Sequence, residues 1–366
     1  MDSGINWPDQ RLLELCDIDC PIIQAPMAGA GGSALAGAVS AAGGLGSLPC
    51  AMLNPQQIQA EIDIIRHHTN RPFNLNFFCH EPAPHDADKL AAWQARLAPY
   101  YRAEGLEPTA KVPTANRAPF DEVTCRLVEL VQPAVVSFHF GLPAAALLAR
   151  VKASGAKTLS SATTVREARW LAAHGVDAII AQGYEAGGHR GMFLEDDITA
   201  QPGVMALVPQ IVDAVDLPVI AAGGIADGRG IAAALALGAA GVQVGTAFLK
   251  SPEALISDIH RNALDTASDG QTQITNLFSG RPARGLRTKI MHEIGPMSVD
   301  APAFPAAGSA LAPLKTAAEK DGRGDFSALW SGQAARLAIS APAADIVQRL
   351  TAETADRLHS LMPRDR

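Results

Sequence analysis

A histidine set among glycines stands near the middle of the chain, within residues 177–191. The stretch opens with the apolar run AIIA, typical of a buried parallel strand, and continues as QGYEAGGHRG around His189. Glycines allow a backbone to come close to a ligand, and α/β enzymes place catalytic groups just past the carboxyl ends of strands. A histidine can take a carbon-bound proton or, once protonated, hold an anion. We therefore expect His189 to be catalytic; a solvated loop histidine is the alternative.

Two Gly-containing turns later in the chain could hold a phosphate. The motif AAGGI contains Gly223 and Gly224, and the motif GVQVGT contains Gly245 and Thr246. Their backbone N–H groups and the threonine hydroxyl can donate to phosphate oxygens without help from a lysine. The alternative is that both motifs only form tight turns between a strand and a helix.

Three amide side chains are expected at strand ends, those of Gln24, Asn76 and Gln182. The isoalloxazine ring of a flavin presents both donors and acceptors, and an amide can meet either kind. Several amides at one rim, together with a phosphate site, favour FMN as the cofactor.

Eight strand-like runs alternate with helical patterns over the first part of the chain. The strands are expected at residues 21–29, 43–50, 73–79, 135–141, 157–162, 178–181, 218–225 and 241–246. This alternation predicts an α/β fold, a parallel (β/α)8 TIM barrel. An open doubly wound sheet is the weaker alternative, because no acidic partner for a ribose follows the second strand, where residues 47–50 read SLPC.

Two segments depart from this alternation. Residues 80–119 are rich in proline and charge around one helix at 86–102, which is typical of a functional loop or lid. After the eighth strand, helical stretches flank a basic, loop-like piece at 279–285, so a small helical cap is expected there. The predicted domains are an FMN-binding barrel, residues 1–251 and 325–366, and a cap or substrate domain, residues 252–324.

Composition narrows the class of protein. A net charge of −7 with no cluster of Lys or Arg argues against nucleic acid as a partner. No apolar stretch has the length of a membrane helix, and the start of the chain lacks the pattern of a secretory signal. Five scattered cysteines suit free thiols in a reducing cytoplasm and give no metal-binding pattern. We expect a cytoplasmic enzyme that binds no membrane and no metal.

Six sequence blocks resemble the nitronate monooxygenase family, formerly called 2-nitropropane dioxygenases, over about two thirds of the chain. The blocks are QAPMAG, NLNFF, VVSFHFGLP, AQGYEAGGHRG, AAGGIADGRG and GVQVGTAFL. The resemblance implies an FMN-dependent barrel that oxidises alkyl nitronates, such as propionate 3-nitronate, with dioxygen to a carbonyl compound and nitrite or nitrate. It implies that His189 is catalytic and that His139 binds substrate. The remaining cofactor-binding candidates in these blocks are Ala25, Pro26, Met27, Gly187, Gly188, Gln243 and Val244.

Other interpretations stay open. Flavin-dependent enoyl-acyl-carrier-protein reductases and quinone reductases resemble the same barrel, so an NAD(P)H-dependent reductase is the alternative function. A flavin-storing or regulatory barrel is the non-catalytic alternative, and a homodimer is possible.

Several other side chains are expected in ordinary structural roles. Glu185 and Arg190 are expected to pair and hold their loop. Trp330, which precedes Ser331, is expected to pack in the core, and a place in the lining of the pocket is the alternative. The remaining histidines that we expect at the surface are His67, His68, His80, His85 and His174.

Overall fold

The computed structural model describes residues 6–83, 86–108 and 117–361. Within them, eight parallel strands form one sheet in the order β1-β9-β8-β6-β5-β4-β3-β2. The strands are β1 (Ile22–Gln24), β2 (Gly46–Pro49), β3 (Phe73–Phe78), β4 (Val135–His139), β5 (Lys157–Ala162), β6 (Ala178–Gln182), β8 (Val219–Ala222) and β9 (Gly241–Val244). A parallel bridge between Ile23 and Leu45 joins β1 to the β2 edge. The sheet thus closes into the predicted barrel.

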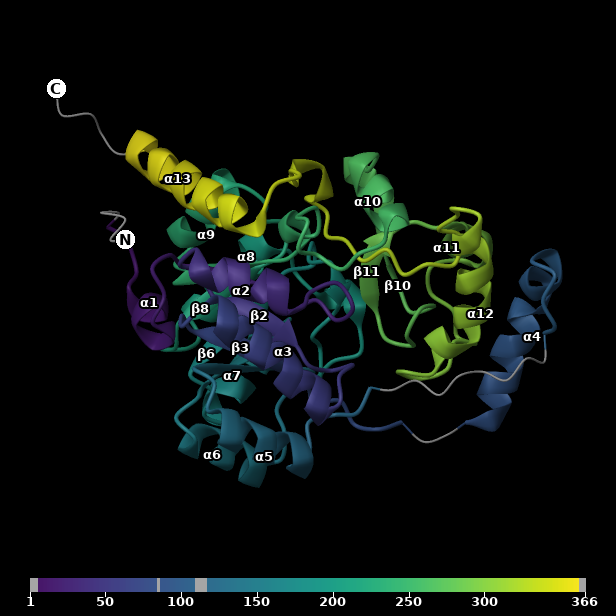
Figure 1. Cartoon of the computed structure of the whole chain (residues 1–366), viewed down its shortest axis with the longest axis horizontal. Helices are drawn as coiled ribbons and strands as arrows, with labels where there is room; N and C mark the ends of the chain where they lie inside the picture. Colours follow the sequence, from purple (N-terminus) through teal and green to yellow (C-terminus); the bar gives the residue numbers. More distant parts are fainter. Residues whose placement is uncertain (1–5, 84–85, 109–116, 362–366) are drawn as a thin grey trace.

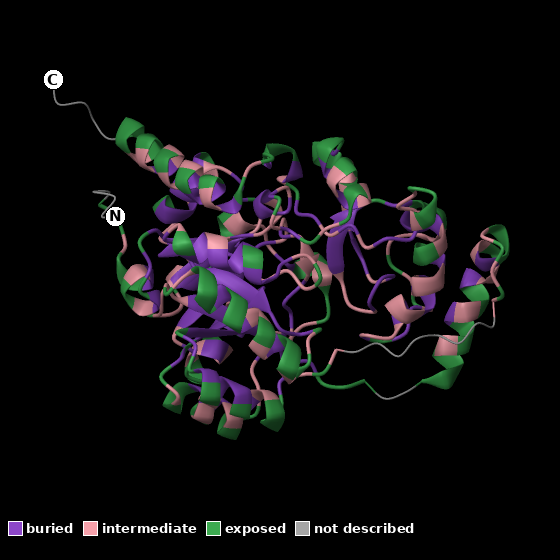
Figure 2. Cartoon of the chain, in the orientation of Figure 1, coloured by how far each residue is buried: buried purple, intermediate pink, exposed green. Residues whose placement is uncertain are grey.

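Helices follow the strands and cover the outside of the barrel (Figure 1). Those of the barrel and its N-terminal approach are α1 (Arg11–Cys16), α2 (Ser33–Ala41), α3 (Pro55–His68), α5 (Glu122–Val131), α6 (Ala145–Ala153), α7 (Val165–Ala173), α8 (Val204–Val212) and α9 (Gly228–Ala236). The C-terminal helix α13 (Ala343–Leu361) packs on α9 and α2. Buried faces turn toward the strands and exposed faces toward solvent (Figure 2), as expected for amphipathic helices on a parallel sheet.

The small residues of α2 have a packing reason. A Cβ atom added to Gly46 at the start of β2 would lie 1.9 Å from the carbonyl oxygen of Ala36 in α2. The helix backbone therefore lies directly against the strand, which only glycine at this position allows.

The segment after β9 is not wholly helical, which corrects the expected helical cap. It contains α10 (Asp258–Asp265), β10 (Thr272–Thr275), β11 (Ala283–Leu286), α11 (Lys289–Ile294) and α12 (Ala307–Lys320). Strand β11 pairs antiparallel with β10 and with β7 (Gly188–His189), so part of the expected basic loop is a strand. Short turns of 3-10 helix complete the described elements: η1 (Ile198–Ala200), η2 (Thr246–Phe248), η3 (Asp269–Gln271) and η4 (Ala335–Leu337).

Helix α4 (Ala87–Ala103), from the segment expected to be a lid, packs against α12 of the cap (Figure 1). Trp93 is buried there and donates to the Ala307 carbonyl at 3.1 Å. The Tyr101 hydroxyl donates to the Ala310 carbonyl at 2.5 Å. The part of residues 80–119 that the structure describes is therefore a layer of the cap. The exact boundaries at residues 252 and 324 stay a prediction.

None of the helices in the described ranges combines the length and the apolar character that crossing a lipid bilayer requires.

Candidate active site

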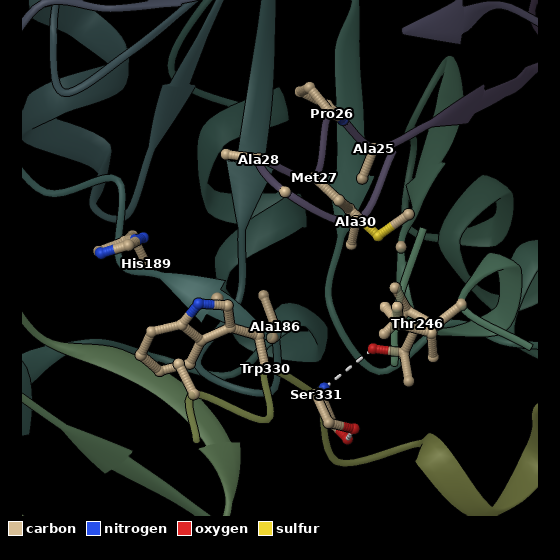
Figure 3. Close-up of a pocket in the computed structure, with 18 of the residues that line it drawn as sticks. Ala25, Pro26, Met27, Ala28, Ala30, Ala186, His189, Thr246, Trp330 and Ser331 are labelled. Carbon is tan, nitrogen blue, oxygen red and sulfur yellow. Dashed lines mark hydrogen bonds between the residues drawn. The ribbon is translucent and has the colours of Figure 1, made fainter. Parts of the chain in front are cut away.

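A cavity of about 460 Å³ lies at the carboxyl ends of the barrel strands, beneath the cap. Turns that follow β1, β6, β8 and β9 line it, and the segment 327–332 that returns from the cap forms the facing wall (Figure 3). Its volume falls in the range of sites for small ligands and cofactors. Among the residues expected at the site, the cavity is lined by Ala25, Pro26, Met27, Asn76, His139, Gln182, Gly187, Gly188, His189, Gly223, Gly224, Gln243, Gly245 and Thr246.

Gln24 and Val244, also expected to bind cofactor, do not line this cavity. The Gln24 side chain is fully buried, accepts from the Ser47 N–H at 2.9 Å and donates to the Ala25 carbonyl. Val244 is buried too, and its carbonyl accepts from the Ala25 N–H at 2.8 Å. Both residues hold the turn after β1 in place.

The glycine turns after β8 and β9 present unpaired donors to the cavity. Gly223 and Gly224 have φ values of +115° and +70°, and a Cβ at Gly223 would lie 2.9 Å from the Ala186 nitrogen. The N–H groups of Gly223, Gly224 and Gly245 have no hydrogen-bond partner in the part of the chain that the structure describes. Grouped backbone donors of this kind form an anion site.

The wall opposite these turns contains Trp330, for which the sequence predicted core packing and left a place in the pocket as the alternative. Thr246 Oγ1 accepts from the Gly332 N–H at 2.9 Å, which leaves the hydroxyl hydrogen of Thr246 free to donate (Figure 3). Trp330, expected in the core, lines the cavity with its ring 5.5 Å from that of His189. In the sequence, the sign of this wall is the short motif WSGQ at residues 330–333, which follows a long stretch without the alternation of strands and helices.

Gln243 and Gln182 both line the cavity, but only Gln243 has an amide oxygen without a hydrogen-bond partner among the described residues. Gln243 Oε1 is buried and has no partner within the described ranges. Gln182 is satisfied at both ends, since its Oε1 accepts from the Gly191 N–H at 2.7 Å and its Nε2 donates to the His189 carbonyl at 2.9 Å. Gln243 can therefore receive a donor from a ligand, whereas Gln182 fixes the strand that carries His189.

His189 is held from both the barrel and the cap. It lies on β7, opposite Ala283 of β11, rather than in the predicted loop. Its Nε2 is 2.8 Å from the Ser279 hydroxyl, between β10 and β11. Its side chain lines the cavity, so a ring fixed by the cap is presented to whatever the barrel binds.

The surroundings of His189 favour its neutral form. Burial lowers the pKa of His189 well below its usual value, and the nearby charges of Arg117 and Arg281 lower it further. Neither arginine forms a salt bridge with a residue that the structure describes. Arg281 instead lies over the Phe140 ring at 4.1 Å and donates to the Met192 carbonyl at 2.6 Å. The cavity thus contains a neutral His189 and the Arg117 side chain, and Arg281 lies close enough to act on the ring through its charge.

His139 is also neutral, and both of its ring nitrogens are engaged. Its Nε2 lies 3.3 Å from the His189 carbonyl and its Nδ1 lies 3.0 Å from the Ser161 hydroxyl. Because a carbonyl only accepts, Nε2 carries the hydrogen and Nδ1 accepts from Ser161. Burial, followed by the charge of Arg281, lowers the pKa of His139 to about 3. His139 therefore presents a neutral imidazole ring, and no positive charge, to the cavity.

The expected pairing of Glu185 with Arg190 is wrong, although both residues hold the loop. Arg190 is buried and donates to Gln201 at 2.7 Å and to the Gly183 carbonyl at 2.9 Å. Glu185 accepts from the Val204 N–H at the start of α8. Each side chain satisfies a different part of the backbone.

His80, expected at the surface, is buried at 5% exposure, with its ring 4.8 Å from that of Phe304. His67, His68 and His174 are exposed as predicted, and His85 lies outside the described residues. The position of His80 two residues after the end of β3 was the signal that could have placed it at the rim of the barrel, near His189.

Comparisons with known proteins agree with this geometry. The family model described as nitronate monooxygenase matches residues 9–353. The chain is 44% identical over 355 residues to a nitronate monooxygenase of Paraburkholderia phytofirmans, covering 96% of this chain and 97% of that protein. It is 42% identical over 345 residues to a nitronate monooxygenase of Pseudomonas aeruginosa, covering 94% and 98%.

Solved structures show the same relationship. A nitroalkane oxidase from Streptomyces ansochromogenes has a TM-score of 0.87 at 38% identity, covering 96% of this chain and 100% of that chain. FabK from Thermotoga maritima has a TM-score of 0.74 at 29% identity, covering 96% and 97%. With its barrel, its histidine-bearing cavity and a family match over nearly its whole length, the chain belongs to the nitronate monooxygenase family, whose members are flavin-dependent oxidoreductases.

Proposed function

We propose that the chain binds FMN and oxidises alkyl nitronates, such as propionate 3-nitronate, with dioxygen to a carbonyl compound and nitrite or nitrate. The observation that carries the proposal is the neutral His189, fixed at the wall of the cavity beside Arg117 and Arg281. A neutral histidine can accept a proton, and a nearby guanidinium charge attracts the anion that results.

The cavity meets the two demands of a flavin mononucleotide. The unpaired N–H groups of Gly223, Gly224 and Gly245, with the Thr246 hydroxyl, would hold the phosphate. The unpaired Oε1 of Gln243 would accept from an N–H group of the ring. The chemistry that the bound cofactor supplies is electron transfer from the nitronate to dioxygen.

The residues around the cofactor would divide the remaining tasks. His189 takes the proton from the carbon of a neutral nitroalkane, and a nitronate that is already ionised does not need this step. Arg117 and Arg281 attract the anionic nitronate, or the carboxylate of a substrate that carries one. The rings of Phe78, His139 and Trp330 exclude water from the same space.

Aerobic turnover tests this function. Purified protein reconstituted with FMN should consume dioxygen when a nitronate is added and should release nitrite or nitrate and a carbonyl compound. A protein that takes up no FMN, or that takes it up and leaves every nitronate unchanged, contradicts the proposal. The second outcome would favour the flavin-storing or regulatory alternative.

The reductase alternative has one observation in its favour, the structural similarity to FabK over nearly the whole chain. It would require rapid reduction of the bound flavin by NADH. A cytoplasmic location and a homodimer stay predictions of the sequence. Gel filtration of the holoprotein with light scattering tests the homodimer, since a monomeric mass would exclude it.

A further inference from the structure

We infer that Ser279 fixes the tautomer of His189, so that Nε2 carries the hydrogen and Nδ1 is the atom that accepts the proton. Ser279 would be a positioning residue, supplied by the cap to a histidine that the barrel holds. The catalytic consequence rests on the proposed function, whereas the tautomer itself can be measured without it.

The hydrogen bonds of Ser279 give the direction. Its hydroxyl lies 2.8 Å from His189 Nε2 and 3.2 Å from the carbonyl of Arg281. A hydroxyl has one hydrogen to give, and a carbonyl can only accept. If Ser279 donates to Arg281, then Nε2 must carry a hydrogen and donate to Ser279, and both contacts are satisfied.

The opposite arrangement satisfies fewer groups. Were Ser279 to donate to His189, the Arg281 carbonyl would lose its one hydrogen-bond partner in the part of the chain that the structure describes. Leaving the carbonyl of this half-buried residue without a partner is unfavourable, so the first arrangement is preferred. The hydrogen bond at one ring nitrogen of a histidine sets the state of the other, so Ser279 leaves Nδ1 without a hydrogen.

The backbone around Ser279 is tightly constrained, as a positioning role requires. Ser279 is 1% exposed. The next residue, Gly280, has a φ of +88°, and a Cβ there would lie 2.2 Å from the Pro302 carbonyl oxygen. The Gly280 N–H donates to the Asn276 carbonyl at 2.7 Å. The turn thus requires glycine at position 280, and its backbone places the Ser279 hydroxyl 2.8 Å from His189 Nε2.

The tautomer can be read by ¹⁵N NMR of FMN-loaded protein labelled at histidine, with His189→Asn used to assign the signals. We expect a neutral ring with the hydrogen on Nε2. Ser279→Ala should shift His189 toward a mixture of tautomers, and Ser279→Thr, which keeps a hydroxyl, should restore the original signals. The matched control is Ser251→Ala, since Ser251 is 0% exposed and does not line the cavity.

Kinetics give the second readout. Loss of a residue that orients a functional histidine typically costs about 10- to 100-fold in activity. Ser279→Ala should lower kcat/KM for a neutral nitroalkane by this amount, with a much smaller loss for the pre-formed nitronate. Ser251→Ala should leave both values unchanged.

A hydrogen on Nδ1 in the unaltered protein would overturn the inference, as would unchanged His189 signals in Ser279→Ala. If the signals shift as expected but no nitronate is turned over, the proposed function fails while the tautomer assignment stands.

Discussion

His189 is a neutral side chain that lies near two positively charged ones, those of Arg117 and Arg281. Burial and two nearby arginines lower the pKa of the ring, so it stays neutral where a free histidine would begin to protonate. The same arginines offer the positive charge that a protonated His189 would otherwise supply to an anion. Under the proposed function, proton transfer and anion binding would therefore belong to different side chains, which the sequence alone could not separate because both tasks suited one histidine.

Replacement of His189 by asparagine tests its role as a base. His189→Asn should keep flavin bound, because the phosphate donors lie on other turns. Its activity on a neutral nitroalkane should fall by about 10²–10⁴-fold, the usual cost of losing a positioned base. Activity on the pre-formed nitronate should fall less, because that substrate has already lost its proton. Steady-state kinetics on both forms would check this, and equal losses would indicate anion binding instead.

Two buried histidines should make the protein sensitive to acid. Burial lowers the pKa of His80 and of His260 to about 4, whereas an unfolded histidine titrates near about 6.5. Between these values the unfolded chain binds more protons, so the free energy of unfolding falls as the pH drops from about 6.5 to about 4. Each residue contributes at most about 1.4 kcal/mol per pH unit.

Urea unfolding at a series of pH values measures this slope. His260→Gln should flatten it, and His67→Gln, at an exposed position of α3, should leave it unchanged. A slope that is the same in His260→Gln and in the unaltered protein would contradict the assignment.

At the scale of elements, the barrel followed from local pattern and the cap did not. Apolar runs such as residues 178–181 became buried strands because the crossover helices cover the outer face of the barrel and side chains fill its interior. Strands β10 and β11 have four residues each, and β7 has two. Strand β11 pairs with β10 nearby in the chain, but it also pairs with β7, where Ala283 lies opposite His189. Strands this short, one of them paired with a segment far away in the sequence, show no local periodicity.

Because β7 and β11 are far apart in the sequence, the contact between Ser279 and His189 could not be predicted from it. Ser279 and His189 are neighbours only because β7 joins β11, and the basic piece at 279–285 resembled a loop. Asn76, Gly223 and Gly245 could be placed at the cavity because the apolar pattern already showed their strands: Asn76 lies in β3, and the two glycines directly follow β8 and β9.

Packing of α4 on the cap can be tested at Trp93, which is fully buried against α12. Trp93→Ala should lower the free energy of unfolding by about 3–5 kcal/mol, the usual cost of removing a buried aromatic side chain. Leu130→Ala, at a position that is 83% exposed, should have a small effect. Thermal and urea unfolding would measure both, and a small effect of Trp93→Ala would mean that α4 is not an integral layer of the cap.

For the molecule as a whole, the barrel and the cap together line the cavity. The turns after β8 and β9 present backbone donors to it, and the returning segment with Trp330 and Gly332 forms the facing wall. His189 belongs to both parts, because its strand leaves the barrel and pairs with the cap. Under the proposed function, the barrel turns would hold the cofactor and His189 would be the base for the substrate.

The most direct measurement is the absorbance of the flavin-loaded protein under anaerobic conditions, after addition of a nitronate and, separately, of NADH. The account predicts fast bleaching of the flavin by the nitronate and slow or no bleaching by NADH, because the sequence contains no complete dinucleotide fingerprint. Fast bleaching by NADH without any by a nitronate would contradict it and would identify a reductase.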